Sequence, residues 1–377
     1  MLLRYGARNF FCFRDWMIID LTFNSKFSKD TNIDGVARSM CLKGANSSGK
    51  TNSLKALAFL GHFCKNSFNN KPDQSLFIDS YFGNSDPVEF FIDFKIDKIE
   101  FSYEAIVTNN SVISEKIFKK EKRKVLVISR NKDKLEKNSL FDNKREIILR
   151  NNASIISTAH QYEISEFQPI YGFFDSIITN VGYSGLLQDF MNYMKLSEAY
   201  NNDKDMLKFV TKNIVKFDTG IEDIRIGSFK NDKNEISYFP VFKHLTEISS
   251  SDLLFISQSS GTKSLYLYLV FYYLTLQRGG LLVLDEFDIN LHPDILPHLV
   301  ELFDNVESNP KHAQIIFSTH NTDVLDIMGK YRTYLFNKEN GNSYCYRLDE
   351  LDNTLIRNDR SLSPLYKSGK IGGVPKI

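Results

Sequence analysis

The segment from Gly44 to Thr51 constrains the fold more than any other part of this chain. Its sequence, GANSSGKT, matches the pattern GxxxxGK[ST], in which glycines let backbone N–H groups turn towards phosphate oxygens. The pattern stands between a predicted strand at 39–43 and a predicted helix at 53–60, which is the context that the motif requires. The sequence therefore predicts a phosphate-binding loop at a helix N-terminus, where the helix dipole favours an anion.

The polar positions of this loop can be assigned roles in holding a nucleoside triphosphate. Lys50 would place its ammonium between the β- and γ-phosphates, and the Thr51 hydroxyl would take one position on octahedral Mg²⁺. The alternative is a Gly-Ser loop that ends in Lys-Thr by chance, which the flanking strand and helix disfavour. The candidate ATP-binding residues are Gly44, Asn46, Ser47, Ser48, Gly49, Lys50, Thr51 and Asn52.

A pair of acids, Asp285 and Glu286, directly follows the apolar run LLVL at 281–284, which is typical of a buried parallel strand. Carboxylates at this end of a strand face the crevice where doubly wound sheets bind ligands. Asp285 would hold Mg²⁺ through water, and Glu286 would polarise the attacking water as a general base. Exposed acids are common at strand ends, so this pair alone is a weak signal. The phosphate loop earlier in the sequence is what favours a functional role for it. The long separation of the two motifs predicts a large inserted lobe.

A hydroxyl and glycine cluster at 257–264, SQSSGTKS, precedes an apolar helical stretch at 265–276. It offers a second helix N-terminus to an anion. As a lone feature it would be an ordinary N-cap. Its position, shortly before the Asp-Glu motif in the sequence, favours a functional role.

His320 ends the sequence FSTH, which follows another short apolar run at 315–317. A histidine at this place could donate a hydrogen bond to the γ-phosphate and so report its presence. A single histidine at a strand end is more often structural. Its occurrence with the other three motifs favours the functional interpretation.

The middle of the chain is predicted to hold a sheet and a charged insertion. Residues 88–107 alternate apolar and charged side chains, as one-sided antiparallel strands do. Between residues 115 and 150 there are thirteen basic and six acidic residues, for which a solvated, exposed helical lobe is favoured over a nucleic-acid surface. Residues 160–215 are predicted to be largely helical, and residues 357–377 to form a mobile basic tail.

The predicted domains follow from this layout. Residues 1–65 form the N-terminal part of a head with the phosphate loop, residues 66–250 an antiparallel and helical, basic insertion lobe, and residues 251–377 the C-terminal part of the head with the tail. The 377 residues carry a formal charge of +1, so overall charge does not indicate nucleic-acid or membrane binding. Four cysteines without a CxxC pair argue against a disulfide framework and a zinc ribbon. We expect a cytoplasmic protein without a signal peptide or membrane span.

Taken in order, the four motifs resemble those of the ATP-binding-cassette ATPases, specifically the heads related to the SMC and OLD proteins. In detail the chain is most similar to AAA-like ATPases of bacterial phage-defence and abortive-infection systems, of the RloA and AbiL type. The opening ARNFFCFRDWMIIDLTF resembles their first strand pair, residues 258–263 match their signatures, and DEFDINLHP resembles their extended acidic motif. Between about 65 and 250 the resemblance rests on layout alone. It implies an α/β P-loop NTPase fold, an ABC-type head with a mixed core sheet, an antiparallel β subdomain and a helical insertion.

The resemblance also implies a site shared by two subunits that enclose two ATP molecules. Ser259 and Gly261 would contact the γ-phosphate bound to the other subunit, residues 288–292 would link the two sites, and His320 would be the switch histidine. Gln258 and Ser260 depart from the usual signature. Gln161 is our choice for the glutamine loop, with Gln168 and Gln188 as alternatives.

The leading functional hypothesis is a homodimeric ATPase that closes on ATP and Mg²⁺ and controls a nuclease or toxin in anti-phage defence. We expect this effector to be a separate protein encoded nearby, because the stretch after His320 is shorter than the nuclease domain of OLD-type ATPases. Alternatives are an ATP-gated scaffold that sequesters an effector, a DNA-repair ATPase of SMC type, and a transporter subunit, which the antiparallel and basic segments disfavour. Direct DNA binding through residues 116–150 is a side hypothesis, and no membrane partner is expected.

Overall fold

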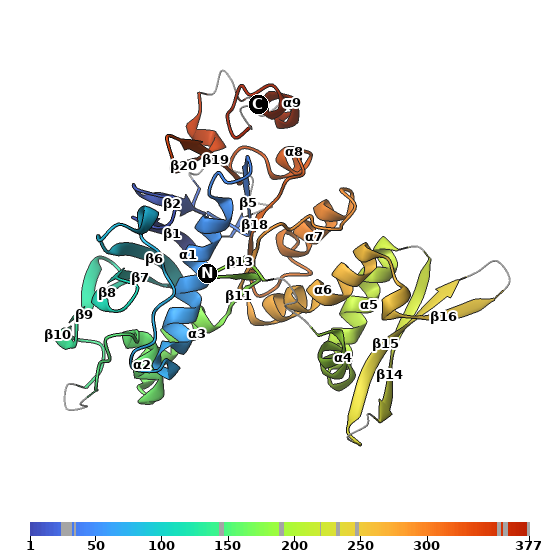
Figure 1. The fold of residues 1–377 in the computed structure, drawn as a ribbon, viewed down its shortest axis with the longest axis horizontal. Coiled ribbons are helices and arrows are strands. Elements are labelled where there is room, and N and C mark those ends of the chain that lie inside the picture. The colour runs from blue at the N-terminus through green and yellow to red at the C-terminus, as the bar shows by residue number, and fades with distance from the viewer. Residues whose placement is uncertain are drawn as a thin grey trace.

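The computed structural model describes residues 1–23, 32–33, 35–142, 147–187, 192–218, 220–230, 234–245, 249–352, 356 and 361–374. Figure 1 shows an antiparallel sheet on one side, a core sheet in the middle and a smaller lobe on the other side, with the C-terminal part of the chain above the core. The phosphate loop lies in the core, at the upper end of the long helix α1.

The core sheet has six strands and is parallel except at one edge. In spatial order the strands are β11 (Ile177–Thr179), β17 (Leu281–Leu284), β18 (Gln314–Ser318), β5 (Ser39–Gly44), β19 (Thr333–Glu339) and β20 (Asn342–Arg347). Only β20 runs antiparallel to its neighbour. Every residue of β5, β17 and β18 is buried, as expected for apolar strands covered on both faces. The predicted strands at 281–284 and 315–317 are therefore confirmed.

Successive residues of the core strands point alternately into two hydrophobic cores, one on each face of the sheet. Leu281 and Val283 pack into the core that contains α1 and the antiparallel sheet. Leu282 and Leu284 face the opposite core, which contains α6 and α7. The helices on the two faces are α1 (Lys50–Asn66), α6 (Ser260–Arg278) and α7 (Ile295–Asp304), and the short α8 (Val324–Met328) follows β18. The helical stretches predicted at 53–60, 262–276 and 294–305 lie in these helices or within one residue of them.

The second large sheet is antiparallel and has seven strands. In spatial order they are β10 (Lys134–Asn138), β9 (Lys124–Asn131), β8 (Val112–Lys120), β7 (Ile99–Val107), β6 (Val88–Ile96), β1 (Leu2–Arg8) and β2 (Met17–Asp20). The antiparallel strands predicted at 88–107 are confirmed as β6 and β7. The helix favoured for residues 115–150 is wrong, because β8, β9 and β10 extend this sheet. Their charged residues alternate with apolar ones across a pleat, whereas an exposed helix would group its apolar residues at a period of 3.6.

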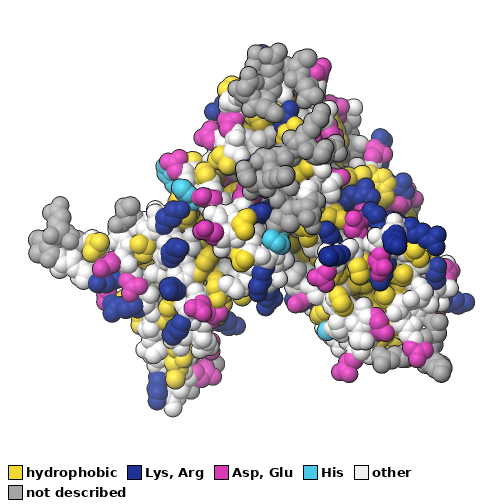
Figure 2. Space-filling model, turned by 180° about the vertical axis from the view of Figure 1, so that it is seen from behind, with side chains coloured by type: hydrophobic (Ala, Val, Ile, Leu, Met, Phe, Trp, Pro, Cys, Tyr) yellow, Lys and Arg dark blue, Asp and Glu magenta, His cyan; other side chains and the backbone are white. Residues whose placement is uncertain are grey.

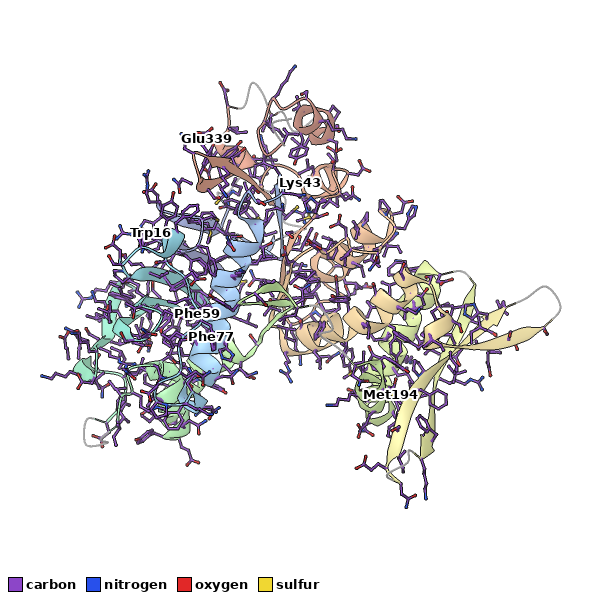
Figure 3. The ribbon with its side chains drawn as sticks, in the orientation of Figure 1. Trp16, Lys43, Phe59, Phe77, Met194 and Glu339 are labelled. Carbon is purple, nitrogen blue, oxygen red and sulfur yellow. The ribbon has the colours of Figure 1, made fainter. Side chains whose placement is uncertain are left out.

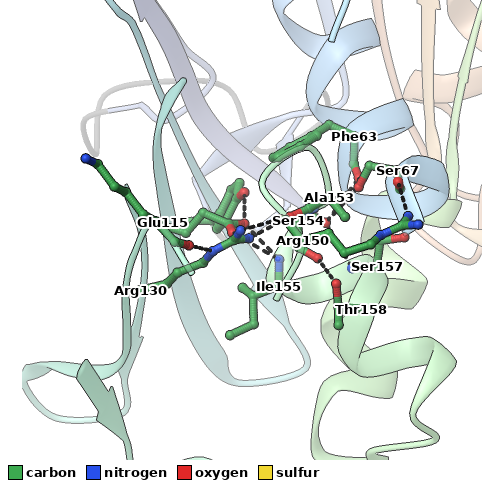
Figure 4. A network of polar contacts seen from close by, with 12 residues as sticks. Phe63, Ser67, Glu115, Arg130, Arg150, Ala153, Ser154, Ile155, Ser157 and Thr158 are labelled. Carbon is green, nitrogen blue, oxygen red and sulfur yellow. Dashed lines mark hydrogen bonds and ion pairs between the residues drawn. The ribbon is translucent and has the colours of Figure 1, made fainter. Parts of the chain in front are cut away.

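A buried ion pair fastens this sheet to the helical layer beside it (Figure 4). Arg130 Nη1 donates to Glu115 Oε2 at 2.5 Å, and neither side chain is exposed to solvent. Glu115 also accepts hydrogen bonds from the Tyr103 hydroxyl and from Ile155 N, at the start of α2 (Ile155–Gln161). Arg130 Nε, Nη1 and Nη2 each donate to a backbone carbonyl as well, and Nη1 donates to that of Ala153. Each guanidinium nitrogen and both carboxylate oxygens thus have a hydrogen-bond partner, which offsets the cost of burying two charges.

The segment predicted to be largely helical contains helices and a core strand that the sequence did not reveal. Its helices are α2, α3 (Gln168–Asp175), α4 (Tyr193–Asn202) and α5 (Lys204–Phe217). Between them β11 enters the core sheet, although it belongs to the range predicted as an inserted lobe, and the short strands β12 (Val181–Gly182) and β13 (Gly185–Leu186) follow. The predicted division at residues 65 and 250 stays a prediction.

The lobe on the far side of α6 combines α4 and α5 with three antiparallel strands. These are β14 (Ile221–Lys230), β15 (Ile236–Leu245) and β16 (Ser250–Leu254), and β14 and β15 extend away from the body of the molecule (Figure 1). A short pair, β3 (Asn32–Ile33) and β4 (Val36–Ala37), precedes β5. None of the helices in the described part of the chain is long and apolar enough to cross a membrane.

The C-terminal part of the chain is packed where the structure describes it, so a mobile tail is the wrong description of residues 361–374. Helix α9 (Leu362–Lys367) and Ile371 join Leu325 and Leu335 in a third hydrophobic cluster. The remaining residues of the predicted tail, 357–360 and 375–377, lie outside the described residues.

Candidate functional site

The phosphate loop connects β5 to α1 through two glycines that no other residue could replace without strain. A Cβ on Gly44 would stand 2.6 Å from the backbone oxygen of Phe336. Gly49 has φ of 112°, in the left-handed region, and a Cβ there would meet the Phe13 ring at 2.8 Å. These positions match the two glycines of the sequence pattern, so the pattern reflects close packing as well as phosphate binding.

Lys50 points back over the loop. Its ammonium donates to the carbonyls of Gly44 and Ala45, each at 2.9 Å, and the residue is 6% exposed. Burial lowers the pKa of Lys50, while the carboxylates of Asp285 and Glu286 act in the opposite direction. The ammonium therefore sits at the centre of the loop, in the electric field of the two acids.

Thr51 and Asp285 meet although they are far apart in the sequence. Thr51 Oγ1 donates to Asp285 Oδ2 at 2.7 Å, and Asp285 Oδ1 accepts a hydrogen bond from the Ser318 hydroxyl. The structure thus brings together the two residues predicted to hold Mg²⁺. A hydroxyl and a carboxylate at a phosphate loop are the protein ligands that Mg²⁺ uses when phosphates and waters complete its octahedron.

Glu286 is held by its backbone in an unusual conformation. Its φ is 50°, and its N–H donates to Ser318 Oγ at 2.9 Å, while Phe287 N donates to Ser318 O at 3.0 Å. A non-glycine residue in this region costs of order 1–3 kcal/mol and persists where neighbours enforce it. Among the described residues, no hydrogen bond or ion pair engages the Glu286 carboxylate. This acid is therefore oriented by its main chain and available for a ligand.

Asn180 is a site residue that the sequence motifs did not identify. It directly follows β11 and is buried, its Nδ2 donates to Asp285 O at 3.0 Å, and its Oδ1 accepts from Asp285 N at 2.8 Å. This side chain therefore fixes the peptide groups on both sides of Asp285. The signal available in the sequence was its position after the short run Ile-Ile-Thr at 177–179, and three residues are too few to predict a strand.

His320 lies at the end of β18 beside the acids. Its N–H donates to Asp288 Oδ2 at 3.2 Å, and its carbonyl accepts from the Lys43 ammonium. Burial and the positive charge of Lys50 lower the pKa of the His320 imidazole, against the opposing influence of Asp288. The sequence-predicted His320 thus belongs to the same cluster as Lys50 and Glu286.

Ser259 and Gly261 lie at the N-terminus of α6, on the side of the lobe. Ser259 is the N-cap, and its Oγ accepts from Thr262 N at 3.1 Å. A Cβ on Gly261 would meet the carbonyl of Asn290 at 3.0 Å, so this helix end packs against the predicted linking loop at 288–292. Both the N-cap interpretation and a role for these residues in anion binding agree with this geometry.

The structure does not bring Gln161 to the site. Gln161 is exposed at the end of α2, and α2 packs against the end of α1 opposite the phosphate loop, where Ser157 Oγ donates to Lys65 O. Gln168 is also exposed and contacts His160. Gln188 lies outside the described residues. The sequence predicted helix around Gln161 but did not predict the strand β11. It therefore gave no basis for placing this glutamine relative to the core sheet.

A cavity of about 610 Å³ opens on the outer face of the phosphate loop. Lys43, Asn46, Ser48 and His320 line one wall of it, and residues of β19 and of the C-terminal segment 361–374, among them Tyr366, line the other. The Ser48 hydroxyl is buried and has no hydrogen-bond partner among the described residues. Such an orphaned donor fits a phosphate ligand. Of the other loop residues, Ser47 has φ of 60° and is exposed, and Asn52 Nδ2 contacts Cys12 Sγ at 3.1 Å.

The basic segment 115–150 does not form a surface of one sign. Arg130 is buried, and Lys119, Lys120 and Lys124 each pair with a nearby glutamate. Figure 2 shows basic and acidic side chains interleaved on the side of the molecule that holds the antiparallel sheet. Glu100 and Glu104, which lie outside the segment, offset two of its seven excess positive charges, and acids are interleaved with the rest, which weakens the hypothesis of DNA binding there.

Comparisons with known proteins identify the family and the fold of the chain. Residues 39–326 match the model of the family described as "AAA domain, putative AbiEii toxin, Type IV TA system". No curated protein matches the chain.

Several solved structures are similar to the chain at low sequence identity. An SMC head bound to the C-winged helix domain of ScpA is 14% identical over 93% of this chain and 99% of that one, with a TM-score of 0.50. The SMC head domain from Thermotoga maritima is 15% identical over 92% and 98%, with a TM-score of 0.47. The recombination mediator RecF is 10% identical over the same shares, with a TM-score of 0.35. The first of these shows the shared fold, a P-loop ATPase head with a mixed sheet and an antiparallel subdomain.

Proposed function

Because the chain belongs to this family of AAA domains, we propose that it binds and hydrolyses ATP with Mg²⁺ and that two copies close head to head around the nucleotides. In this proposal Lys50 holds the β- and γ-phosphates, Glu286 activates the attacking water and His320 contacts the γ-phosphate. Thr51 and Asp285 would hold Mg²⁺, which would neutralise part of the negative charge of the phosphates.

The observation that carries the proposal is the convergence of three separate segments on one point. The Ser318 hydroxyl donates to Asp285 and accepts from Glu286 N, and Asp285 in turn accepts from Thr51. A cation ligand pair and an unengaged acid are thus fixed beside a phosphate loop before any ligand binds. Preorganisation of this kind is what phosphoryl transfer requires of a protein, since positioning and charge stabilisation supply most of the catalysis.

The position of the signature residues supports a site completed by a second copy. The cavity beside the phosphate loop is lined by residues of β5, β19 and the C-terminal segment and by none from 257–263. Ser259 and Gly261 instead stand at the start of α6, directly after the lobe strand β16. Each copy therefore carries a phosphate loop and a separate helix N-terminus, and a head-to-head pair would bring the two together.

The deciding experiment replaces Glu286 by glutamine. Glu286→Gln should still bind ATP and Mg²⁺, release phosphate at least a hundredfold more slowly, and elute as a dimer with ATP, because the general base is lost while the ligands remain. Glu301→Gln, an exposed glutamate on α7, is the matched control and should behave as wild type. Wild-type turnover by Glu286→Gln, or calorimetry that detects no ATP uptake by the wild type, would contradict the proposal.

We further propose that nucleotide-driven closure controls a partner effector, a nuclease or toxin, in anti-phage defence of the RloA and AbiL type. The support is the family description, which refers to a toxin–antitoxin system, and the solved SMC head that binds a winged-helix domain. Co-purification with the product of the adjacent gene, with and without ATP, tests this step.

Two alternatives can be distinguished from this proposal by experiment. A scaffold that merely sequesters the effector would release it equally well with Glu286→Gln, whereas an ATPase switch would not. A DNA-repair ATPase of SMC type would bind DNA with an affinity that falls as salt rises, since phosphate contacts release counterions. The paired lysines of β8 and β9 make this second alternative the weaker one.

A further inference from the structure

The backbone of His320 is held from both sides by charged side chains. On one side the Asp288 carboxylate accepts from His320 N at 3.2 Å and from Asn321 N at 3.0 Å. On the other side the Lys43 ammonium donates to His320 O. Asp288 lies in the predicted linking loop and Lys43 is the last residue before the phosphate loop, so the position of His320 depends on both neighbours.

Lys43 is an unusual residue for its position. It lies in the central strand β5, where the other residues are apolar or small, and it is 2% exposed. A buried lysine costs free energy unless its ammonium is engaged. Here the ammonium contacts the His320 carbonyl and lies 5.1 Å from the centre of the Tyr366 ring. Burial lowers the pKa of Lys43, while Asp288 acts in the opposite direction.

Tyr366 comes from the C-terminal segment 361–374, which is anchored to the loop after His320. The Tyr366 hydroxyl donates to Gly373 O at 2.8 Å, and Gly373 N donates to Asn337 Oδ1 at 2.7 Å. At the start of α9, the Ser363 hydroxyl donates to Thr322 O at 2.9 Å, two residues after His320. Figure 3 places Lys43 at the upper end of β5, below the part of the chain that carries α8 and α9.

From these contacts we infer that Lys43 is a positioning residue for His320 and that the Tyr366 ring holds Lys43 in place. The inference rests on the proposed function, in which His320 contacts the γ-phosphate. Lys43 lines the cavity beside the phosphate loop, but its ammonium donates to the His320 carbonyl and lies over the Tyr366 ring, so we assign it to holding His320 and not to binding phosphate. The C-terminal segment thereby becomes part of the ATPase machinery: displacing it would release Lys43 and, through it, the switch histidine.

The test compares Lys43→Met with Lys330→Met. Methionine fills a similar volume without the charge. Lys330 is a matched control, since it is also a buried lysine that lies over a tyrosine ring, at 5.2 Å from Tyr331, and donates to a backbone carbonyl. Lys43→Met should lower kcat about tenfold and leave the Kd for ATP within about twofold, because the phosphate loop keeps Lys50. Lys330→Met should change neither value. Tyr366→Phe, which keeps the ring, should retain more turnover than Tyr366→Leu.

A double variant shows whether Lys43 acts through His320. Adding Lys43→Met to His320→Ala should not slow turnover further, because the residue being positioned is gone. An equal additional loss in the double variant would overturn the inference. So would a parallel loss of ATP affinity and turnover in Lys43→Met, which would place Lys43 in phosphate binding.

Hydrogen exchange decides the inference even if the proposed function fails. If the wild type shows no ATP turnover, the proposed function is wrong, but the amides of His320 and Asn321 still report how firmly the histidine is held. These amides should exchange faster in Lys43→Met than in the wild type or in Lys330→Met. Unchanged exchange in Lys43→Met would refute the positioning role.

Discussion

The Thr51 hydroxyl donates to Asp285 Oδ2 at 2.7 Å, and this bond joins the first turn of α1 to the end of β17. Thr51 follows β5 and Asp285 follows β17, and these two strands are not neighbours, since β18 lies between them. The carboxyl ends of the three parallel strands therefore meet at one edge, and the predicted Mg²⁺ ligands are already in contact there.

Thr51→Ala should weaken magnesium-dependent ATP binding about tenfold, because it removes both a cation ligand and the donor to Asp285. Thr51→Ser keeps the hydroxyl and should stay within about threefold of the wild type. The measurement is calorimetric titration with ATP in the presence of Mg²⁺ and again in EDTA. Equal losses for the two substitutions would show that the methyl group, and not the hydroxyl, matters.

Gly49→Ala should cost about 1–3 kcal/mol of stability and abolish nucleotide binding. The reason is its φ of 112°, combined with a new Cβ that would stand 2.8 Å from the Phe13 ring. Gly172→Ala is a suitable control, since a Cβ at that helical glycine would meet nothing within 4 Å. Urea denaturation measures the stabilities, and a Gly49→Ala protein as stable as the control would contradict the expected strain.

Asn180→Leu should destabilise the protein by about 1–3 kcal/mol and reduce the affinity for Mg²⁺ and ATP. The apolar side chain would leave the N–H and C=O groups of Asp285 without their buried partners. Thermal denaturation and the same calorimetric titration report the two effects. If Asn180→Leu binds ATP normally despite lower stability, Asn180 supports the fold without orienting Asp285.

Breaking the buried pair of Glu115 and Arg130 should cost about 3–5 kcal/mol, because either single substitution leaves an uncompensated buried charge. Arg130→Met and Glu115→Gln both test this by chemical denaturation. Lys120→Ala, which breaks the exposed pair with Glu100, should cost less than about 1 kcal/mol. Similar losses from the buried and the exposed pair would show that burial is not the deciding factor.

The His320 imidazole should titrate below the ordinary value of about 6.5, since burial and the charge of Lys50 both lower its pKa. The ring is then neutral at pH 7, and protonation on acidification favours the unfolded state, in which the pKa is higher. Lys50→Met should raise the midpoint. NMR of histidine-labelled protein measures it, with His320→Gln to assign the signal, and a midpoint above 6.5 in the wild type would contradict this expectation.

The sequence was most informative at positions where local packing or burial allows only one type of residue. At Gly44 and Gly49 tight packing leaves no room for a side chain, and the phosphate-binding pattern requires glycine at the same two positions. The strand at 281–284 was predictable because a parallel strand buried on both faces must be continuously apolar. The fold class was implied by the family resemblance that these motifs carry, and the antiparallel strands were predicted from the alternation over most of residues 88–107.

Other features depended on partners far away in the sequence. The charged residues of β8 and β9 suggested an exposed helix, yet Glu115 is stabilised by Arg130 and Ile155, which no local pattern reveals. Asn180 and β11 escaped prediction because a three-residue strand carries almost no periodicity, and the choice of Gln161 failed with them. The packing of Tyr366 over Lys43 likewise brings together the two ends of the chain.

The placement of β5 between β18 and β19 also bears on how the protein is made. During synthesis the complete phosphate loop leaves the ribosome long before residues 314–339, which form both of its neighbouring strands. The backbone N–H and C=O groups of the apolar strand β5 therefore stay unpaired while most of the chain is still being translated. The strands of the antiparallel sheet lie between residues 2 and 138 and can pair during this time. With α1 packed against it, this sheet would cover one face of β5 before β18 and β19 are made. Nascent chains halted before residue 314 should consequently depend on chaperones more than chains halted after residue 339.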